Sequence, residues 1–172
     1  MSLIKIQSTS QMEQLGKQIA PWLHAGDVVV LHGPLGAGKT TFVRGLGEGL
    51  GVEGMIQSPT FVVARIHQRT DPAKPQLVHV DAYRFSHSDE LLDLDIDFDH
   101  SITVMEWGRP YVERVAEEWL DIDIHTPSED DEVQTAHSDA DSRIVGISGH
   151  TRSGQHGTRY DSLLKELHDS GN

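Results

Sequence analysis

The sequence predicts a single three-layer α/β domain with a largely parallel central sheet, spanning residues 1–172. Three features of the chain predict this fold. Apolar, β-branched runs alternate along the chain with segments whose apolar residues recur at helical spacing. A glycine-rich turn joins one long apolar run to the helix that follows it. The chain length of 172 residues suits one domain with one core.

The first elements surround the glycine-rich turn. Residues 11–24 are expected to form a helix, because their apolar side chains recur at helical spacing and the hydroxyl residues at 8–10 offer N-caps. Residues 28–33 (VVVLHG) read as a strand buried on both faces. Residues 39–50 read as the next helix, although its internal glycines weaken this prediction toward the C-terminal half.

Strands and helices continue to alternate after this helix. The expected strands are residues 61–68, 77–85, 101–108, 119–125 and 143–149, and the expected helices are residues 88–96, 109–118 and 160–168. Residues 119–125 alternate apolar and polar side chains, as a half-exposed strand does, and residues 143–149 are its expected partner. Between them, the polar and acidic residues 126–141 are predicted to form a mobile hairpin loop.

The composition restricts the function. The net charge is −13, and residues 85–108 and 115–142 contain no Lys or Arg. Proteins that bind nucleic acids usually carry a basic patch, so we do not expect this chain to hold RNA or DNA unaided. Its acidic surface is a solvated face or a docking face for a basic partner. The chain has no cysteine, which excludes disulfides, thiolate zinc sites and a Cys nucleophile. No apolar run is long enough to span a membrane and no signal peptide is visible, so a cytoplasmic protein is expected.

The clearest functional motif is residues 33–40, GPLGAGKT, which match the phosphate-loop pattern G-x-x-x-x-G-K-[ST] in full. Its glycines let the backbone N–H groups form an anion-binding nest, Lys39 adds a positive charge for the outer phosphates, and Thr40 offers a hydroxyl to Mg²⁺. The fold prediction is therefore a P-loop NTPase fold. The candidate nucleotide-binding residues here are Gly33, Pro34, Leu35, Gly36, Ala37, Gly38, Lys39, Thr40 and Thr41.

Two acidic residues follow predicted strands and are candidates for the catalytic and metal positions. Asp81 ends LVHVD and Glu106 ends SITVME, so both should project from the carboxyl edge of the sheet, where a Mg²⁺-nucleotide site needs a carboxylate. Ser58 and Thr60, in an SPT turn, could meet a γ-phosphate or simply form a turn. Guanine-specific sites usually carry an [NT]-K-x-D anchor, which this chain lacks, so ATP is favoured over GTP.

These segments together resemble the bacterial TsaE (YjeE) family, whose members help make threonylcarbamoyladenosine in tRNA. The matching pieces are GPLGAGKTTFVRGLGEGLG, SPTF, HVDAYR with an acidic DELLDLD helix, and EWG, in the family's order between residues 26 and 108. Pro34 replaces an Asp that is often found in the family, and residues 126–141 are unusually acidic, which puts any partner surface there in doubt.

The resemblance implies a Mg²⁺-dependent ATPase, weak alone and stimulated by partners, that binds a TsaD–TsaB pair and meets tRNA only through that complex. By motif position, Lys39 would bind phosphates, and Thr40 with Glu106 would hold Mg²⁺. Asp81 would act near the attacking water or the metal. Ser58 to Thr60 would form a switch-like segment, and Trp107 would lie beside the nucleotide.

Two other functions remain open from the residues. A small-molecule kinase would need an acceptor pocket and usually an Arg-bearing lid, for which Arg84 and Arg109 are the nearby candidates. A nucleotide-gated binding module would use the same loop residues with only incidental hydrolysis.

Overall fold

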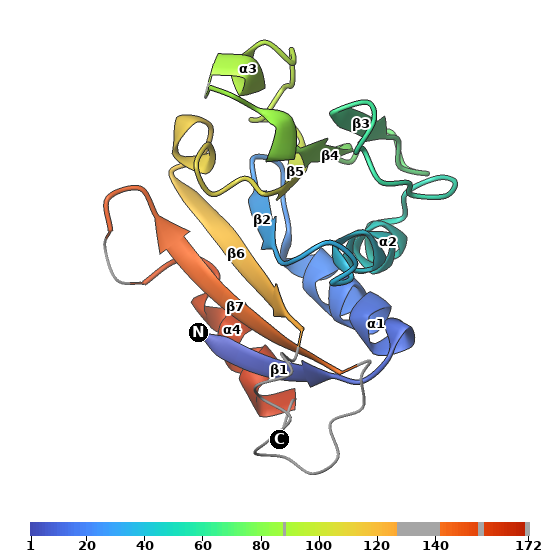
Figure 1. Cartoon of the computed structure of the whole chain (residues 1–172). Helices are drawn as coiled ribbons and strands as arrows, with labels where there is room; N and C mark the ends of the chain where they lie inside the picture. Colours follow the sequence, from blue (N-terminus) through green and yellow to red (C-terminus); the bar gives the residue numbers. More distant parts are fainter. Residues whose placement is uncertain (88, 127–141, 155–156, 171–172) are drawn as a thin grey trace.

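The computed structural model describes residues 1–87, 89–126, 142–154 and 157–170, and within them the chain forms one sheet of seven strands (Figure 1). The strand order is β1-β7-β6-β2-β5-β4-β3. The middle strands β6, β2, β5 and β4 run parallel, and antiparallel strands extend the sheet on both sides. The α/β fold with a largely parallel central sheet is thus confirmed. The strands are β1 (Ser2–Ile6), β2 (Val28–His32), β3 (Ala64–His67), β4 (Leu77–Asp81), β5 (Ile102–Glu106), β6 (Glu118–His125) and β7 (Arg143–Thr151).

The central strands are apolar on both faces because both faces of the sheet are covered. Successive side chains of a strand point to opposite faces. In β2, Val29 and Leu31 join one buried cluster, while Val28 and Val30 join the other. The run VVVLH therefore has no polar side until His32, where the strand reaches the edge of the sheet.

Three helices cover the first face of the sheet, and short helical pieces and loops cover the second. The helices α1, α2 and α4 contribute to the same buried cluster as Val29 and Leu31. On the second face, Leu91 and Val112 pack against Val28 and its neighbours. The helices and 3₁₀ helices (η) are α1 (Thr9–Ile19), η1 (Ala20–Trp22), α2 (Lys39–Leu50), η2 (Ala82–Arg84), α3 (Asp89–Leu92), η3 (Val112–Arg114) and α4 (Asp161–Ser170). None of the helices in the described part of the chain is long and apolar enough to cross a bilayer.

Glycines let α1 and α2 approach each other closely. A Cβ atom added at Gly45 of α2 would lie 1.9 Å from the carbonyl oxygen of Glu13, and one added at Gly16 of α1 would lie 2.4 Å from that of Phe42. The glycines that weakened the helix prediction for residues 39–50 are therefore packing positions. They bring the N-terminus of α2, which carries the phosphate loop, firmly against the core.

We expect Gly45→Ala to destabilise the fold. Alanine has the higher helix propensity, by about 0.8–1 kcal/mol, but the added methyl overlaps backbone that cannot move without separating the helices. Overpacking of this kind costs about 1–3 kcal/mol, so the free energy of unfolding in urea should fall. Gly146→Ala is the control, because its Cβ would meet Leu3 Cδ2 at an ordinary 3.5 Å. Equal stabilities of the two variants would contradict the packing role.

Two sequence predictions differ from the structure. The helix expected at residues 109–118 is wrong, and only η3 forms there. The connection from β5 to β6 must pass across β2, and Arg109 turns toward β6 while the Tyr111 hydroxyl donates to the Phe85 carbonyl, 2.9 Å away. Strand β1 was not expected, because its partner β7 lies at the far end of the sequence.

Other predicted elements are shorter than expected or only partly described. β3 covers Ala64–His67 of the predicted strand 61–68, and α3 is a single turn. β6 and β7 pair antiparallel, in agreement with the pairing expected for these two strands. The mobility expected for the loop at residues 126–141 concerns residues 127–141, which lie outside the described residues.

Candidate functional site

The phosphate loop leaves the end of β2 and opens directly into α2. Gly33 has a φ of +146°, and a Cβ there would lie 2.6 Å from the carbonyl oxygen of Ile124 on β6. Gly38 caps α2 with a φ of +111°. Both conformations are available to glycine and strained for other residues. The loop therefore curls back over the start of α2, whose free N–H groups and dipole favour an anion.

Lys39 lies buried inside this loop, with 6% of its surface exposed. Its Nζ donates to the carbonyl oxygens of Gly33, at 2.8 Å, and Pro34, at 3.1 Å. The Nζ also lies 4.0 Å from Glu106 Oε2 and 4.7 Å from the centre of the Trp107 ring. Burial lowers the pKa of Lys39, and the carboxylates of Glu106 and Asp81 partly oppose that shift. The ammonium group is held at the base of the loop by two backbone carbonyl groups, with the carboxylate of Glu106 at the outer limit of an ion pair.

A cavity of about 520 Å³ opens beside the loop. Every nucleotide, catalytic and metal residue predicted from the sequence lines it except Gly33 and Pro34, whose carbonyl groups hold Lys39 instead. The structure thus brings the loop, the SPT turn and both strand ends together at one place. Tyr83 and Arg84 also line the cavity; Arg84 was expected near the phosphates only as a lid candidate of a kinase, and Tyr83 was not expected there.

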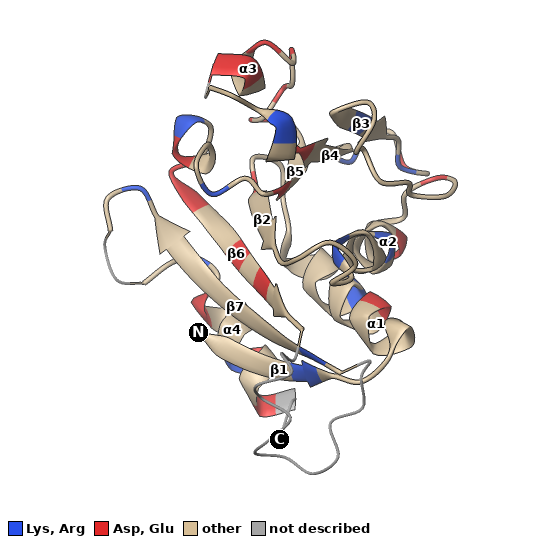
Figure 2. Ribbon diagram, viewed as in Figure 1, with Lys and Arg blue, Asp and Glu red and all other residues tan. Residues whose placement is uncertain are grey.

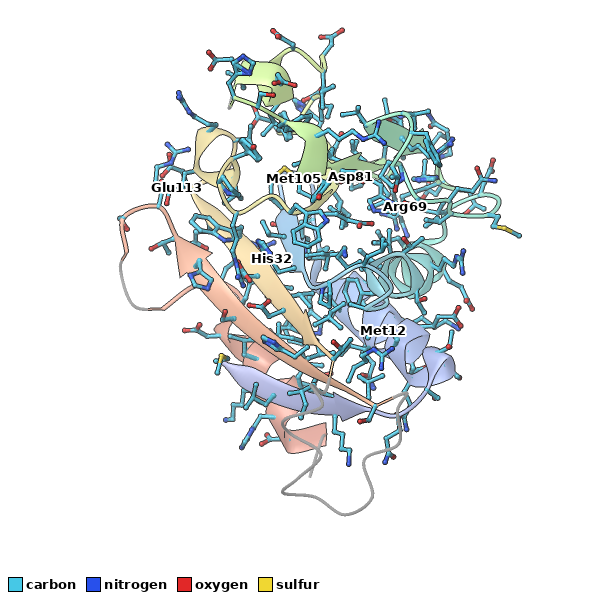
Figure 3. All side chains as sticks on the ribbon, viewed as in Figure 1. Met12, His32, Arg69, Asp81, Met105 and Glu113 are labelled. Atoms are coloured by element: carbon cyan, nitrogen blue, oxygen red, sulfur yellow. The ribbon has the colours of Figure 1, made fainter. Side chains whose placement is uncertain are left out.

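The two acidic residues lie side by side at the carboxyl edge of the sheet. Asp81 and Glu106 are register partners at the ends of the parallel strands β4 and β5, and Figure 3 labels Asp81 beside Met105, the residue before Glu106. Both side chains are mostly buried, with 7% and 5% of their surface exposed. Asp81 Oδ1 accepts a hydrogen bond from the backbone N–H of Tyr83 at 3.1 Å. Glu106 Oε1 lies 2.9 Å from His79 Nε2.

The SPT turn also lines this cavity, through Ser58 and Thr60. The hydroxyl groups of Ser58 and Thr60 are 2.6 Å apart, within hydrogen-bonding distance. The carbonyl group of Pro59 accepts from the N–H groups of Val62 and Val63, and Val63 has a left-handed φ of +67°. This tight turn presents two hydroxyl groups to the cavity from a segment between α2 and β3.

Trp107 reaches the loop through an unusual backbone conformation. Its φ is +62°, a left-handed value that is uncommon for a bulky residue and is often found at functional sites. Its indole ring lies against Lys39 and contacts the rings of His32 and Tyr83, with centroids 5.7 and 5.5 Å away. The turn after β5 thus closes one side of the cavity with aromatic surface.

Arg109 anchors this turn to the sheet. Its Nε and one terminal nitrogen donate to the carboxylate of Asp121 on β6, at 2.9 and 2.5 Å, and it also pairs with Asp123. These bonds raise the pKa of Arg109 further above its usual range, against the effect of burial. Its guanidinium is therefore engaged with β6, whereas Arg84 lies at the cavity.

Three comparisons with known proteins bear on this site. The family model for the "threonylcarbamoyl adenosine biosynthesis protein TsaE" matches residues 6–135, which include the loop, Asp81 and Glu106. The chain belongs to the TsaE family. This confirms the resemblance drawn from the loop, SPTF, HVDAYR and EWG segments. The TsaE family acts in the biosynthesis of threonylcarbamoyladenosine in tRNA.

Individual TsaE proteins and a solved structure are also similar to this chain. The TsaE protein of Streptomyces coelicolor is 54% identical over 112 residues, which are 63% of this chain and 75% of that protein. The TsaE protein of Bacillus subtilis is 37% identical over 163 residues, covering 93% and 90% of the two chains. The crystal structure of Bacillus subtilis YdiB superposes with a TM-score of 0.67 at 27% identity, covering 99% of this chain and 95% of that one.

Proposed function

We propose that this TsaE-family chain binds ATP with Mg²⁺ in the cavity and hydrolyses it for tRNA threonylcarbamoyladenosine formation, in complex with a TsaD–TsaB pair. The observation that carries the proposal is the position of Lys39. Its buried ammonium group lies at the base of a complete phosphate loop, 4.0 Å from the carboxylate of Glu106, in a cavity large enough for a ligand. A triphosphate would offer Lys39 stronger acceptors than the loop carbonyl groups.

The residues present fit a magnesium ion beside the phosphates. Thr40 and Glu106 both line the cavity, and hydroxyl and carboxylate oxygens are ligands that Mg²⁺ accepts. In the described residues, no three His, Asp or Glu side chains converge on a preformed metal site. The ion would therefore draw its remaining ligands from the nucleotide and water. When bound, Mg²⁺ neutralises charge on the phosphate oxygens.

Hydrolysis also requires a group that orients the attacking water. Asp81 has one carboxylate oxygen held by the Tyr83 N–H and lies beside Glu106, so it can accept a hydrogen bond from water near the phosphates. Ser58 and Thr60 face the cavity from the SPT turn and can donate to a γ-phosphate oxygen or to that water. Because these hydroxyl groups belong to a turn, they can report the state of the nucleotide to the surface.

The surface beside the cavity supports action with a protein partner. Leu35, Phe61 and Tyr83 are 99%, 88% and 71% exposed, and Leu35 and Tyr83 line the cavity itself. Exposed apolar groups of this kind are usual at sites that another protein covers. Figure 2 shows acidic residues on α3, and the net charge of the chain is −13, which disfavours direct binding of tRNA. We therefore assign contact with tRNA to the partners.

Steady-state phosphate release tests the proposal. The chain alone should release phosphate slowly from ATP with Mg²⁺ and without any acceptor molecule, and adding TsaD and TsaB should raise the rate. A small-molecule kinase would turn over only with an acceptor, and the engagement of Arg109 with Asp121 and Asp123 removes one of its two lid candidates. A nucleotide-gated binding module would bind its partners in an ATP-dependent manner with no change in hydrolysis. Either result would contradict the proposed ATPase.

A further inference from the structure

His79 contacts the carboxylate of Glu106 from inside the sheet. It is the third residue of β4, and its side chain has 0% of its surface exposed. Its Nε2 lies 2.9 Å from Glu106 Oε1, across the pair of strands. Its Nδ1 is buried and has no hydrogen-bond partner among the described residues. Among the described residues, the bond to Glu106 is thus the one hydrogen bond of this ring.

The chemistry of the two groups fixes the direction of the bond. A carboxylate offers only acceptors, so the proton lies on His79 Nε2, which donates to Oε1. Glu106 Oε1 therefore accepts a hydrogen bond from His79 of β4. The other oxygen, Oε2, lies 4.0 Å from Lys39 Nζ, a distance too long for a hydrogen bond. Glu106 therefore has one oxygen engaged by His79 and one that faces the lysine of the phosphate loop.

Packing alone does not explain a histidine at this position. The neighbours of His79 along β4 are Val78 and Val80, and its register partner on β5 is Val104. A buried ring with an unpartnered nitrogen costs free energy that an aliphatic side chain of similar volume would not. The ring compensates for that cost only through its bond to Glu106.

We propose that His79 is a positioning residue that orients the Glu106 carboxylate toward the magnesium ion of the nucleotide. The inference rests on the proposed function and adds a residue to it. Hydrogen bonds to carboxylates that ligate metals commonly fix their orientation, and removing such a partner typically lowers metal affinity or activity about 10- to 100-fold. His79 would thus act through Glu106, without touching the nucleotide.

Calorimetric titration of the full chain with the non-hydrolysable analogue AMPPNP tests this role. We expect Mg²⁺ to tighten binding to the unaltered chain relative to the same titration in EDTA. His79→Leu should reduce this gain about tenfold or more, while its affinity in EDTA stays unchanged. His79→Gln, whose amide N–H can still reach Oε1, should restore most of the gain. His79→Asn, which is too short to reach it, should resemble the leucine variant and provides a second test if that variant does not fold.

His67→Leu is the matched control. His67 lies on the neighbouring strand β3, half-buried, and its Nε2 has no partner among the described residues, but it makes no hydrogen bond to Glu106. Its Mg²⁺ gain should equal that of the unaltered chain. A full Mg²⁺ gain in His79→Leu, or an equal loss with and without Mg²⁺, would overturn the positioning role alone. An unaltered chain without any Mg²⁺ gain would overturn the proposed function and this inference together.

Discussion

A Lys39→Ala variant should bind ATP roughly 10- to 100-fold more weakly than the unaltered chain, because a hydrogen bond to a charged group contributes about 1.5–3 kcal/mol. Its phosphate release should fall on the order of a hundredfold or more, since a preorganised charge at the reacting phosphate acts mainly in the transition state. The reason lies in the geometry: Lys39 is 6% exposed, and its Nζ donates to the carbonyl oxygens of Gly33 and Pro34 at the base of the loop. Calorimetry with AMPPNP and a phosphate-release assay measure the two effects.

Lys17→Ala is the control for this change. Lys17 lies on α1 and pairs with Glu48 of α2 at 2.7 Å, on the surface and away from the cavity lining. Lys17→Ala removes one positive charge, as Lys39→Ala does, so the two variants have the same net charge. Binding and hydrolysis should be unaffected, because a surface ion pair contributes little to stability. If Lys39→Ala kept full affinity, the loop would not be the phosphate site.

The main parts of the candidate site could be predicted because they depend on local rules. When a β-branched run, a glycine-rich turn and a helix follow one another, the end of the turn lies at the N-terminus of the helix. Lys39 occupies that position here. Asp81 and Glu106 could both be placed at the carboxyl edge of the sheet because each ends an apolar strand, and parallel strands place their carboxyl ends at one edge. The structure adds the register: β4 and β5 are neighbours, and Asp81 lies opposite Glu106.

Other contacts depend on tertiary structure and could not be predicted. The bond from His79 to Glu106 requires the β4–β5 pairing, and from the sequence His79 is only a polar residue within an apolar strand. Trp107 meets Lys39 through a left-handed backbone that no local propensity favours, and Arg109 ties that turn to β6. The signal for Tyr83 was weak but present, because it lies two residues after Asp81, where the chain turns over the edge of the sheet.

The same difference between local sequence rules and tertiary structure explains which elements of the fold could not be predicted. The helix expected at residues 109–118 had suitable helical spacing, yet the chain there must cross β2 before β6 begins at Glu118. Propensity is a weak preference that such constraints override. Strand β1 could not be predicted because its partner strand is distant in the sequence. Its five residues form a strand because they pair antiparallel with β7.

Glu106→Gln should separate metal binding from nucleotide binding. The amide keeps the volume of the side chain and an oxygen that can accept from His79, but it removes the charge. We expect unchanged AMPPNP affinity in EDTA, loss of most of the gain from Mg²⁺, and phosphate release lower on the order of a hundredfold. Lys39→Ala, by contrast, should weaken binding with and without Mg²⁺. Glu117→Gln, which alters an exposed acid paired with Arg152, is the control and should match the unaltered chain. Normal hydrolysis by Glu106→Gln would rule out the metal role.

The stability of Glu106→Gln completes this test. Glu106 and Asp81 are neighbouring carboxylates with 5% and 7% of their surface exposed, and Lys39 Nζ lies 4.0 Å from Glu106 Oε2. Two like charges at the wall of a cavity repel each other and lose hydration, so removing one should leave the free energy of unfolding unchanged or raise it by up to about 1–2 kcal/mol. Urea unfolding without nucleotide measures this value. A variant that is as stable as the unaltered chain or more stable, yet hydrolyses ATP slowly, would show that the charge of Glu106 serves the reaction, whereas a large loss of stability would assign Glu106 a structural role.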